Sequence, residues 1–238
     1  MNAIGIDGCR RGWFFVQLTG SGRYHIGIAE QLEALRVAIT ASELTLIDIP
    51  IGLRSAGAEE RRCDREARKL LGPRASSVFV APCRQALGCE DYASGSSTNR
   101  AVTGRRLSRQ SWAITPKIAE VDTFIRMLSE RRKLREMHPE LCFRALNDSQ
   151  PMGHNKKKAA GHAERLAVLS RWLPQVPKIV EQARARWPRK DLAIDDILDA
   201  LVGAVTAARP GALESLPAVP EKDDKGLSME IVYARGTV

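Results

Sequence analysis

The stretch Ala3-Ile4-Gly5-Ile6-Asp7-Gly8-Cys9 decides the fold, together with Leu44-Thr45-Leu46-Ile47-Asp48-Ile49-Pro50. Each is a short apolar run with an aspartate near its end, and such runs are typical of strands buried on both faces of an α/β sheet. An ionised aspartate is costly beside such strands unless it is paired or binds a cation. Asp7 and Asp48 therefore predict a carboxylate site at one edge of the sheet. The alternative is that each caps a turn, since Asp-Gly and Asp-x-Pro are common turn sequences.

The elements around these runs follow a distinctive order. Strands are predicted over residues 3–7, 12–18 and 23–29, and the connections between them are short enough to require antiparallel pairing. An amphipathic helix over 30–40 then leads to a strand over 44–49, which the crossover makes parallel to its neighbour. The fold class predicted is α/β, with a mixed five-stranded sheet flanked by helices.

Later elements are less regular. Helices are predicted over 58–71, from Pro116 onward, and over 160–172, 178–187 and 194–209; strands are predicted over 76–82, 133–137 and 229–234. Residues 83–110 show little periodicity and predict a long basic loop. We predict a single domain over residues 1–238, with a helical and loop insertion over residues 54–130 after the fourth strand.

Composition narrows the class of protein. With 44% hydrophobic residues the chain can bury a core, and no apolar stretch is long enough to span a membrane. The five cysteines are odd in number and scattered, which fits neither a disulfide framework nor a paired C-x-x-C zinc site. We therefore expect a reduced, cytoplasmic setting and no membrane partner.

The charge is concentrated in the middle of the chain. Residues 100–190 carry 21 Lys and Arg against 8 Asp and Glu, whereas the whole chain has a net charge of +9. A basic face beside carboxylates suits a polyanionic substrate such as nucleic acid; the alternative is a solvated basic surface. The candidate substrate-binding residues are Arg10, Arg62, Arg68, Arg105, Arg109, Lys156 and Lys157. For Arg62 and Arg68 an ion-pair network with Asp64 on a solvated helix face is the competing interpretation.

Two further places put acids in unusual company. In the predicted strand before Pro139, Glu136 and His138 lie on the same side because side chains alternate. Glu140 shares that side, but Pro139 is expected to end the strand, so Glu136 is favoured over Glu140. His138 either orients a water or contacts a phosphate oxygen, or is a hydrogen-bonded residue at a strand end.

The helix over 194–209 supplies the last acids. Asp196 and Asp199 share one helical face at spacing i, i+3. Capping and the helix dipole explain Asp195 and Asp196 as well as a site does. Asp199 lies one turn further in, on an otherwise apolar helix, where capping does not explain it.

Together these acids predict a metal site. Converging carboxylates repel one another unless divalent cations neutralise them, and oxygen-only ligands favour Mg²⁺ or Mn²⁺. Two such ions about 4 Å apart can activate water and stabilise the leaving oxygen in phosphodiester hydrolysis. The predicted ligands are Asp7, Asp48, Glu136 and Asp199, and the predicted catalytic set adds Asp196 and His138.

This arrangement resembles the ribonuclease H-like fold, in which acids lie on the first strand, after the fourth strand and on the last helix. The Asp196-x-x-Asp199-Ala200-Leu201 pattern is similar to the last helix of bacterial Holliday-junction resolvases of that superfamily. More closely, the chain resembles domain-of-unknown-function family 429, whose members are described as predicted nucleases. The motifs that carry this resemblance are Gly5-Ile6-Asp7-Gly8-Cys9-Arg10, Ile47-Asp48-Ile49-Pro50-Ile51-Gly52-Leu53, Arg62-Cys63-Asp64, Ser76-Ser77-Val78-Phe79 and Glu136-x-His138-Pro139-Glu140.

Three functions remain open. The resemblance implies a Mg²⁺- or Mn²⁺-dependent nuclease. A non-catalytic nucleic-acid-binding or regulatory protein could keep the fold and the acids. An actin-like or sugar-kinase-type ATP-binding domain has a similar Gly-x-Asp-x-Gly hairpin, but 238 residues with one such hairpin is too short unless a dimer supplies the other half.

Overall fold

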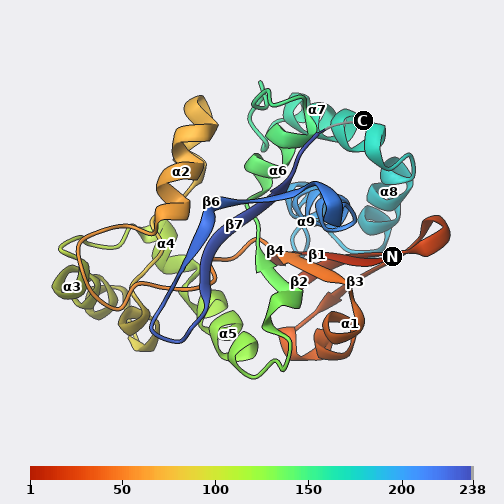
Figure 1. Cartoon of the computed structure of the whole chain (residues 1–238). Coiled ribbons are helices and arrows are strands. Elements are labelled where there is room, and N and C mark those ends of the chain that lie inside the picture. Colours follow the sequence, from red (N-terminus) through yellow and green to blue (C-terminus); the bar gives the residue numbers. More distant parts are fainter. Residues whose placement is uncertain (237–238) are drawn as a thin grey trace. The chain divides into compact units, whose positions relative to one another are not determined.

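A computed structural model describes residues 1–236, which divide into two compact units (Figure 1). Unit 1 contains residues 1–48, 130–214 and those from Val232 on, and unit 2 contains residues 49–129 and 215–231. Unit 2 thus includes a second segment near the C-terminus as well as nearly all of the predicted insertion over 54–130.

Unit 1 is built on a mixed five-stranded sheet of order β3-β2-β1-β4-β5. Its strands are β1 (Asn2–Cys9), β2 (Gly12–Thr19), β3 (Arg23–Ala29), β4 (Leu44–Ile47) and β5 (Leu134–Glu136). The first three pair antiparallel, while β4 is parallel to both β1 and β5. The predicted antiparallel meander followed by a parallel strand is confirmed.

One helix, α9 (Ile194–Ala207), lies directly on the sheet because two glycines allow it. A Cβ at Gly5 would lie 2.0 Å from the carbonyl oxygen of Ala200 and 2.2 Å from the amide nitrogen of Ala204. Gly203 on the helix faces the Gly5 Cα in turn. The close approach fixes which residues of α9 lie beside the ends of β1 and β4.

Helices cover both faces of this sheet (Figure 1). The α9 side carries the main core, which includes Phe14, Val16, Leu46, Leu201 and Val205. The helices of unit 1 other than α9 are α1 (Arg36–Ala41), α6 (Pro139–Leu146), α7 (Ala159–Trp172) and α8 (Val176–Arg186). The α1 helix is shorter than the predicted 30–40 because a 3-10 turn at Leu32–Leu35 precedes it.

Unit 2 is helical, with the helices α2 (Arg62–Leu71), α3 (Tyr92–Thr103), α4 (Arg109–Ala113) and α5 (Thr115–Arg126). The strands β6 (Leu213–Lys222) and β7 (Ser228–Ala234) form a separate two-stranded sheet, and their connecting turn belongs to unit 2. The strand predicted over 229–234 is confirmed as β7, whereas β6 was not predicted.

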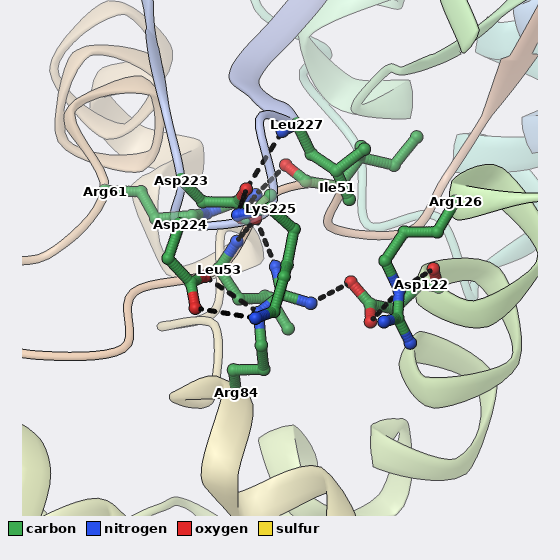
Figure 2. Close-up of polar contacts among 11 residues, drawn as sticks. Ile51, Leu53, Arg61, Arg84, Asp122, Arg126, Asp223, Asp224, Lys225 and Leu227 are labelled. Carbon is green, nitrogen blue, oxygen red and sulfur yellow. Dashed lines mark hydrogen bonds and ion pairs between the residues drawn. The ribbon is translucent and has the colours of Figure 1, made fainter.

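The turn between β6 and β7 is held by Arg84 (Figure 2). Its guanidinium donates to the carboxylates of Asp122 on α5 and of Asp223 in the turn, and over 3.2 Å to Asp224. The fully buried Asp223 carboxylate also accepts the backbone N–H groups of Leu53 and Leu227, at 3.0 and 2.9 Å. These contacts tie four separate segments of unit 2 together.

Two predictions for this unit are wrong. Residues 76–82 form no strand; the Val78 carbonyl accepts from the Arg68 side chain at 3.0 Å instead of from a neighbouring strand. The predicted loop over 83–110 contains α3, which begins with a capping box between Asp91 and Ser94 and ends at Gly104 in the left-handed conformation. Its glycine and serines have low helix propensity, which hid the helix, but both caps were visible in the sequence.

Within residues 1–236, every helix is too short or too polar to span a lipid bilayer. All five cysteines are free thiols.

Candidate active site

Asp7 and Asp48 lie side by side at the ends of adjacent parallel strands. Their preceding residues, Ile6 and Ile47, are paired in the sheet, and the Asp48 N–H donates to the Ile6 carbonyl over 3.1 Å. Side chains alternate along a strand, so Asp7 projects from the same face as Gly5, which is the face that α9 covers. The Asp7 carboxylate accepts the Gly8 N–H at 2.8 Å and is otherwise largely buried.

The third carboxylate comes from α9. Asp199 immediately precedes Ala200, whose carbonyl meets Gly5, and Asp7 lies two residues further along β1 on that face. Asp199 is 2% exposed, so the helix holds it against the sheet and not in solvent. The predicted convergence of Asp7, Asp48 and Asp199 is therefore present.

The electrostatics of the three side chains reflect this crowding. Burial raises the pKa of Asp7 well above its usual value, and the charges of Asp48 and Asp199 raise it further. Burial and the charge of Asp199 raise the pKa of Asp48 to about 7. The pKa of Asp199 is also raised by burial, although a neighbouring lysine opposes the shift. Close acids in a dry setting each favour the protonated form of the others.

That lysine is Lys156, whose Nζ donates to Oδ2 of Asp199 over 2.6 Å. The charge of Asp199 raises the pKa of Lys156 above its ordinary value, and Asp7 and Asp48 add to the effect. Lys156 therefore carries a positive charge among three carboxylates. It was predicted as a substrate-binding residue, and the structure places it within the acid cluster.

The loop that carries Lys156 is fastened to the first turns of α7. The Glu164 carboxylate accepts the N–H groups of Gly153 and His154 at 2.6 and 2.9 Å. Gly161 allows the loop to lie against the helix, since a Cβ there would be 2.0 Å from the Asn155 carbonyl oxygen. The sequence thus builds a rigid support for the Lys156 ammonium.

Glu140, in the first turn of α6, is the fourth acid of the cluster. Its charge raises the pKa of both Asp48 and Asp199, which shows that it faces them. One of its oxygens accepts from the buried Arg165 guanidinium, which also donates to the Gly161 carbonyl over 3.1 Å. The other oxygen, Oε2, is buried and has no hydrogen-bond partner in the described part of the chain.

Glu136 and His138 do not join these acids in the way predicted. Glu136 pairs with Ile47 in the sheet, and the next residue, Met137, contacts Gly203 of α9. Glu136 therefore projects from the opposite face of the sheet to Asp7. His138 is the residue before α6, and its carbonyl accepts the N–H groups that start this helix. Glu140 occupies the place that the sequence argument favoured for Glu136, because Pro139 starts a helix and turns the chain.

Asp196 has the capping role that the sequence left open. Its Oδ2 accepts the Ala193 N–H at 3.0 Å at the start of α9. Burial raises its pKa to about 6, and the charge of Asp199 contributes. Asp196 also raises the pKa of Asp7, so it lies at the margin of the cluster while it caps the helix.

The other predicted substrate contacts are scattered. Arg10 is exposed in the turn between β1 and β2, and Lys157 is exposed next to Lys156. In unit 2, Arg62 pairs with Glu66 at 2.7 Å, Arg68 and Arg105 both pair with Glu60, and Arg109 stacks on the Tyr92 ring. Arg62 and Arg68 thus have the intramolecular ion pairs of the competing interpretation, but Asp64 pairs with the buried Arg61.

The donor chemistry of the cluster fits a hard divalent cation. Asp7, Asp48, Asp199 and the unpartnered Oε2 of Glu140 offer only carboxylate oxygens, which Mg²⁺ and Mn²⁺ prefer. In residues 1–236, however, no three acidic, histidine or cysteine side chains stand in ready-made coordination geometry. The Lys156 ammonium already pairs with Asp199, so a cation that takes Asp199 as a ligand would have to bind with a rearrangement of these side chains.

Comparison with known proteins gives a match to a protein family over most of the chain. A family described as "Protein of unknown function (DUF429)" matches residues 5–222, a span that contains every acid of the cluster. No curated protein and no solved structure gives a significant match to the chain.

Proposed function

The chain belongs to the DUF429 family, and we propose that it is a nuclease that hydrolyses phosphodiester bonds of nucleic acid with the help of Mg²⁺ or Mn²⁺. The single observation that carries the proposal is the convergence of Asp7, Asp48 and Asp199, from two adjacent strands and a helix packed on them. Their raised pKa values indicate a site that gains from a bound cation.

The topology supports a ribonuclease H-like assignment. The order β3-β2-β1-β4-β5, with three antiparallel strands followed by parallel ones, is the arrangement expected of that fold. The acids lie at its expected positions: on β1, directly after β4, and on the last helix α9.

In this proposal Asp7, Asp48, Asp199 and Glu140 hold the cation, with two ions as the full complement. The metal would lower the pKa of an attacking water and stabilise the leaving oxygen. The chain's own contributions are distinct. Arg165 orients Glu140, and the close packing at Gly5 keeps Asp199 beside the strand ends. Lys156 supplies a positive charge near the phosphodiester group, whose approach the basic middle of the chain favours.

A second function has one specific observation in its favour. Lys156 already neutralises part of the acid cluster through its ion pair with Asp199. A nucleic-acid-binding protein without catalytic activity could keep the same residues as structural ion pairs. The two proposals differ in whether a bond is cleaved.

Cleavage assays separate them. Single-stranded, duplex and branched DNA and RNA would be incubated with the protein and Mn²⁺ or Mg²⁺, with Asp48→Asn as the test variant. Glu181→Gln, an exposed acid on α8, serves as the matched control. The nuclease proposal expects cleavage that needs the cation, that falls at least 100-fold in Asp48→Asn and that persists in the control. Binding of nucleic acid without cleavage by any of the proteins would favour the second function.

A further inference from the structure

A pocket of about 440 Å³ lies beside the start of α7, the end of α8 and the segment that enters α9. Four basic groups line it: Lys157, His162, Arg184 and Arg189. Trp187 and Leu192, both buried in the core, form an apolar wall. All of these residues belong to unit 1, and none of the lining residues is acidic.

Within residues 1–236, the cations of this pocket have no counter-ions. In the described part of the chain, the side chains of Lys157, Arg184 and Arg189 form no ion pair or hydrogen bond, although Arg165 and Arg171 nearby are both paired. The ring nitrogen Nε2 of His162 is buried and also has no hydrogen-bond partner among the described residues. Three unpaired cations and an unsatisfied imidazole nitrogen around one pocket indicate a site for an anion.

The wall of the pocket adds a second requirement for the ligand. Trp187 is fixed, because its ring packs edge-on against Phe14 with centroids 5.8 Å apart and Arg186 lies 4.7 Å over it. A volume of this size is within the usual range for small organic ligands. A ligand with both a phosphate group and an apolar or planar part therefore suits the pocket better than a bare ion.

The pocket adjoins the acid cluster along the chain. Lys157 directly follows Lys156, whose Nζ contacts Asp199, and Ile194 on the pocket wall starts the helix that carries Asp199. A strand with its scissile phosphate at the carboxylates would bring a neighbouring nucleotide towards these cations. We propose that the pocket binds one phosphorylated nucleoside unit of a nucleic-acid strand. The identity of the strand as a substrate rests on the proposed function, but the binding does not.

The test is equilibrium binding of a labelled single-stranded oligonucleotide in EDTA, over a range of salt concentrations. The test variant is the double substitution Arg184→Gln/Arg189→Gln, and both side chains are exposed, so the fold should be unaffected. The matched control is Lys178→Gln. Lys178 is an exposed cation on α8, the helix that carries Arg184, and it does not line the pocket. Inorganic phosphate and a nucleoside monophosphate serve as competitors and distinguish a free nucleotide from a strand.

We expect the double variant to bind at least tenfold more weakly than the wild type, while the control stays close to it. The slope of log affinity against log salt is negative, and in the double variant its magnitude should decrease by about 1.4. This corresponds to the loss of about two phosphate contacts at about 0.7 each. Equal affinity and slope in the double variant and the control would overturn the proposal. So would pocket-dependent binding of the monophosphate with none of the oligonucleotide. If the oligonucleotide binds through the pocket but the protein cleaves no nucleic acid, the result supports the pocket proposal and contradicts the nuclease proposal.

Discussion

The ammonium group of Lys156 lies 2.6 Å from the Asp199 carboxylate, across 43 positions of sequence, and so brings a positive charge into a group of acids on β1, directly after β4 and on α9. Asp199 is almost fully buried, whereas Lys156 keeps part of its side chain in solvent. Lys156 is therefore the internal counter-ion of the acid cluster.

Replacing Lys156 by methionine should leave these acids without their counter-ion. Breaking a buried pair by removing one partner costs about 3–5 kcal/mol, and because Lys156 is partly exposed we expect a loss of about 2–3 kcal/mol at pH 8. At pH 5 the loss should be smaller, because the unopposed carboxyls take up protons. Urea unfolding at the two pH values measures this, with Lys178→Met as the control. Equal stability of the two variants at pH 8 would contradict it.

Asp48 should make the folded protein less stable as the pH rises. Its pKa is about 7 in the folded state and about 3.8 when unfolded, so between these values the folded state holds the extra proton. Rising pH then favours unfolding, by up to about 4 kcal/mol for three pKa units. Asp48→Asn removes this dependence. The variant should match the wild type near pH 4 and exceed it in unfolding free energy at pH 8. If the unfolding free energy of both the wild type and the variant rises steadily over this pH window, the prediction is contradicted.

Gly5 should tolerate no side chain. A Cβ at this position would lie 2.0 Å from the Ala200 carbonyl oxygen, so Gly5→Ala must push α9 off the sheet and carry Asp199 with it. We expect a loss of at least about 3 kcal/mol in unfolding free energy. Gly211→Ala, where nothing lies within 4 Å of the new Cβ, is the control and should change little. Equal melting temperatures of the two variants would show that the helix does not pack this closely.

In unit 2 the two adjacent acids of the β6–β7 turn should differ strongly in how much their removal lowers the free energy of unfolding. Asp223 is fully buried, pairs with Arg84 and accepts three backbone N–H groups, whereas Asp224 is 42% exposed. Asp223→Ala leaves these backbone donors without a partner and removes one of the carboxylates that pair with the mostly buried Arg84 guanidinium, so we expect a loss of about 3–5 kcal/mol. Asp224→Ala should cost less than about 1 kcal/mol. Chemical denaturation compares them, and similar losses would contradict the proposed role of Asp223.

Part of the fold and part of the acid cluster could be predicted from the sequence. Buried apolar runs and short connections determined β1 to β4, and an acid on an apolar helix identified Asp199, because these signals are local. The choice between Glu136 and Glu140 depended on where a strand becomes a helix, and Pro139 decides that at a single residue. The position of Lys156 within the acid cluster could not be predicted from the sequence, because it depends on a loop that Glu164 holds against the following helix. The caps of α3 were readable in the sequence, but its poor helix formers concealed the helix between them.

The central claim is that the acids on β1, directly after β4 and on α9 form one cation site. Calorimetric titration of Mn²⁺ and Mg²⁺ into the wild type, Asp48→Asn and the control Glu181→Gln tests it most directly. The account predicts saturable binding to the wild type and to the control, and a loss of at least one ion or a tenfold weaker affinity in Asp48→Asn. Identical binding by all three proteins, or no binding by any of them with an oligonucleotide present, would contradict it.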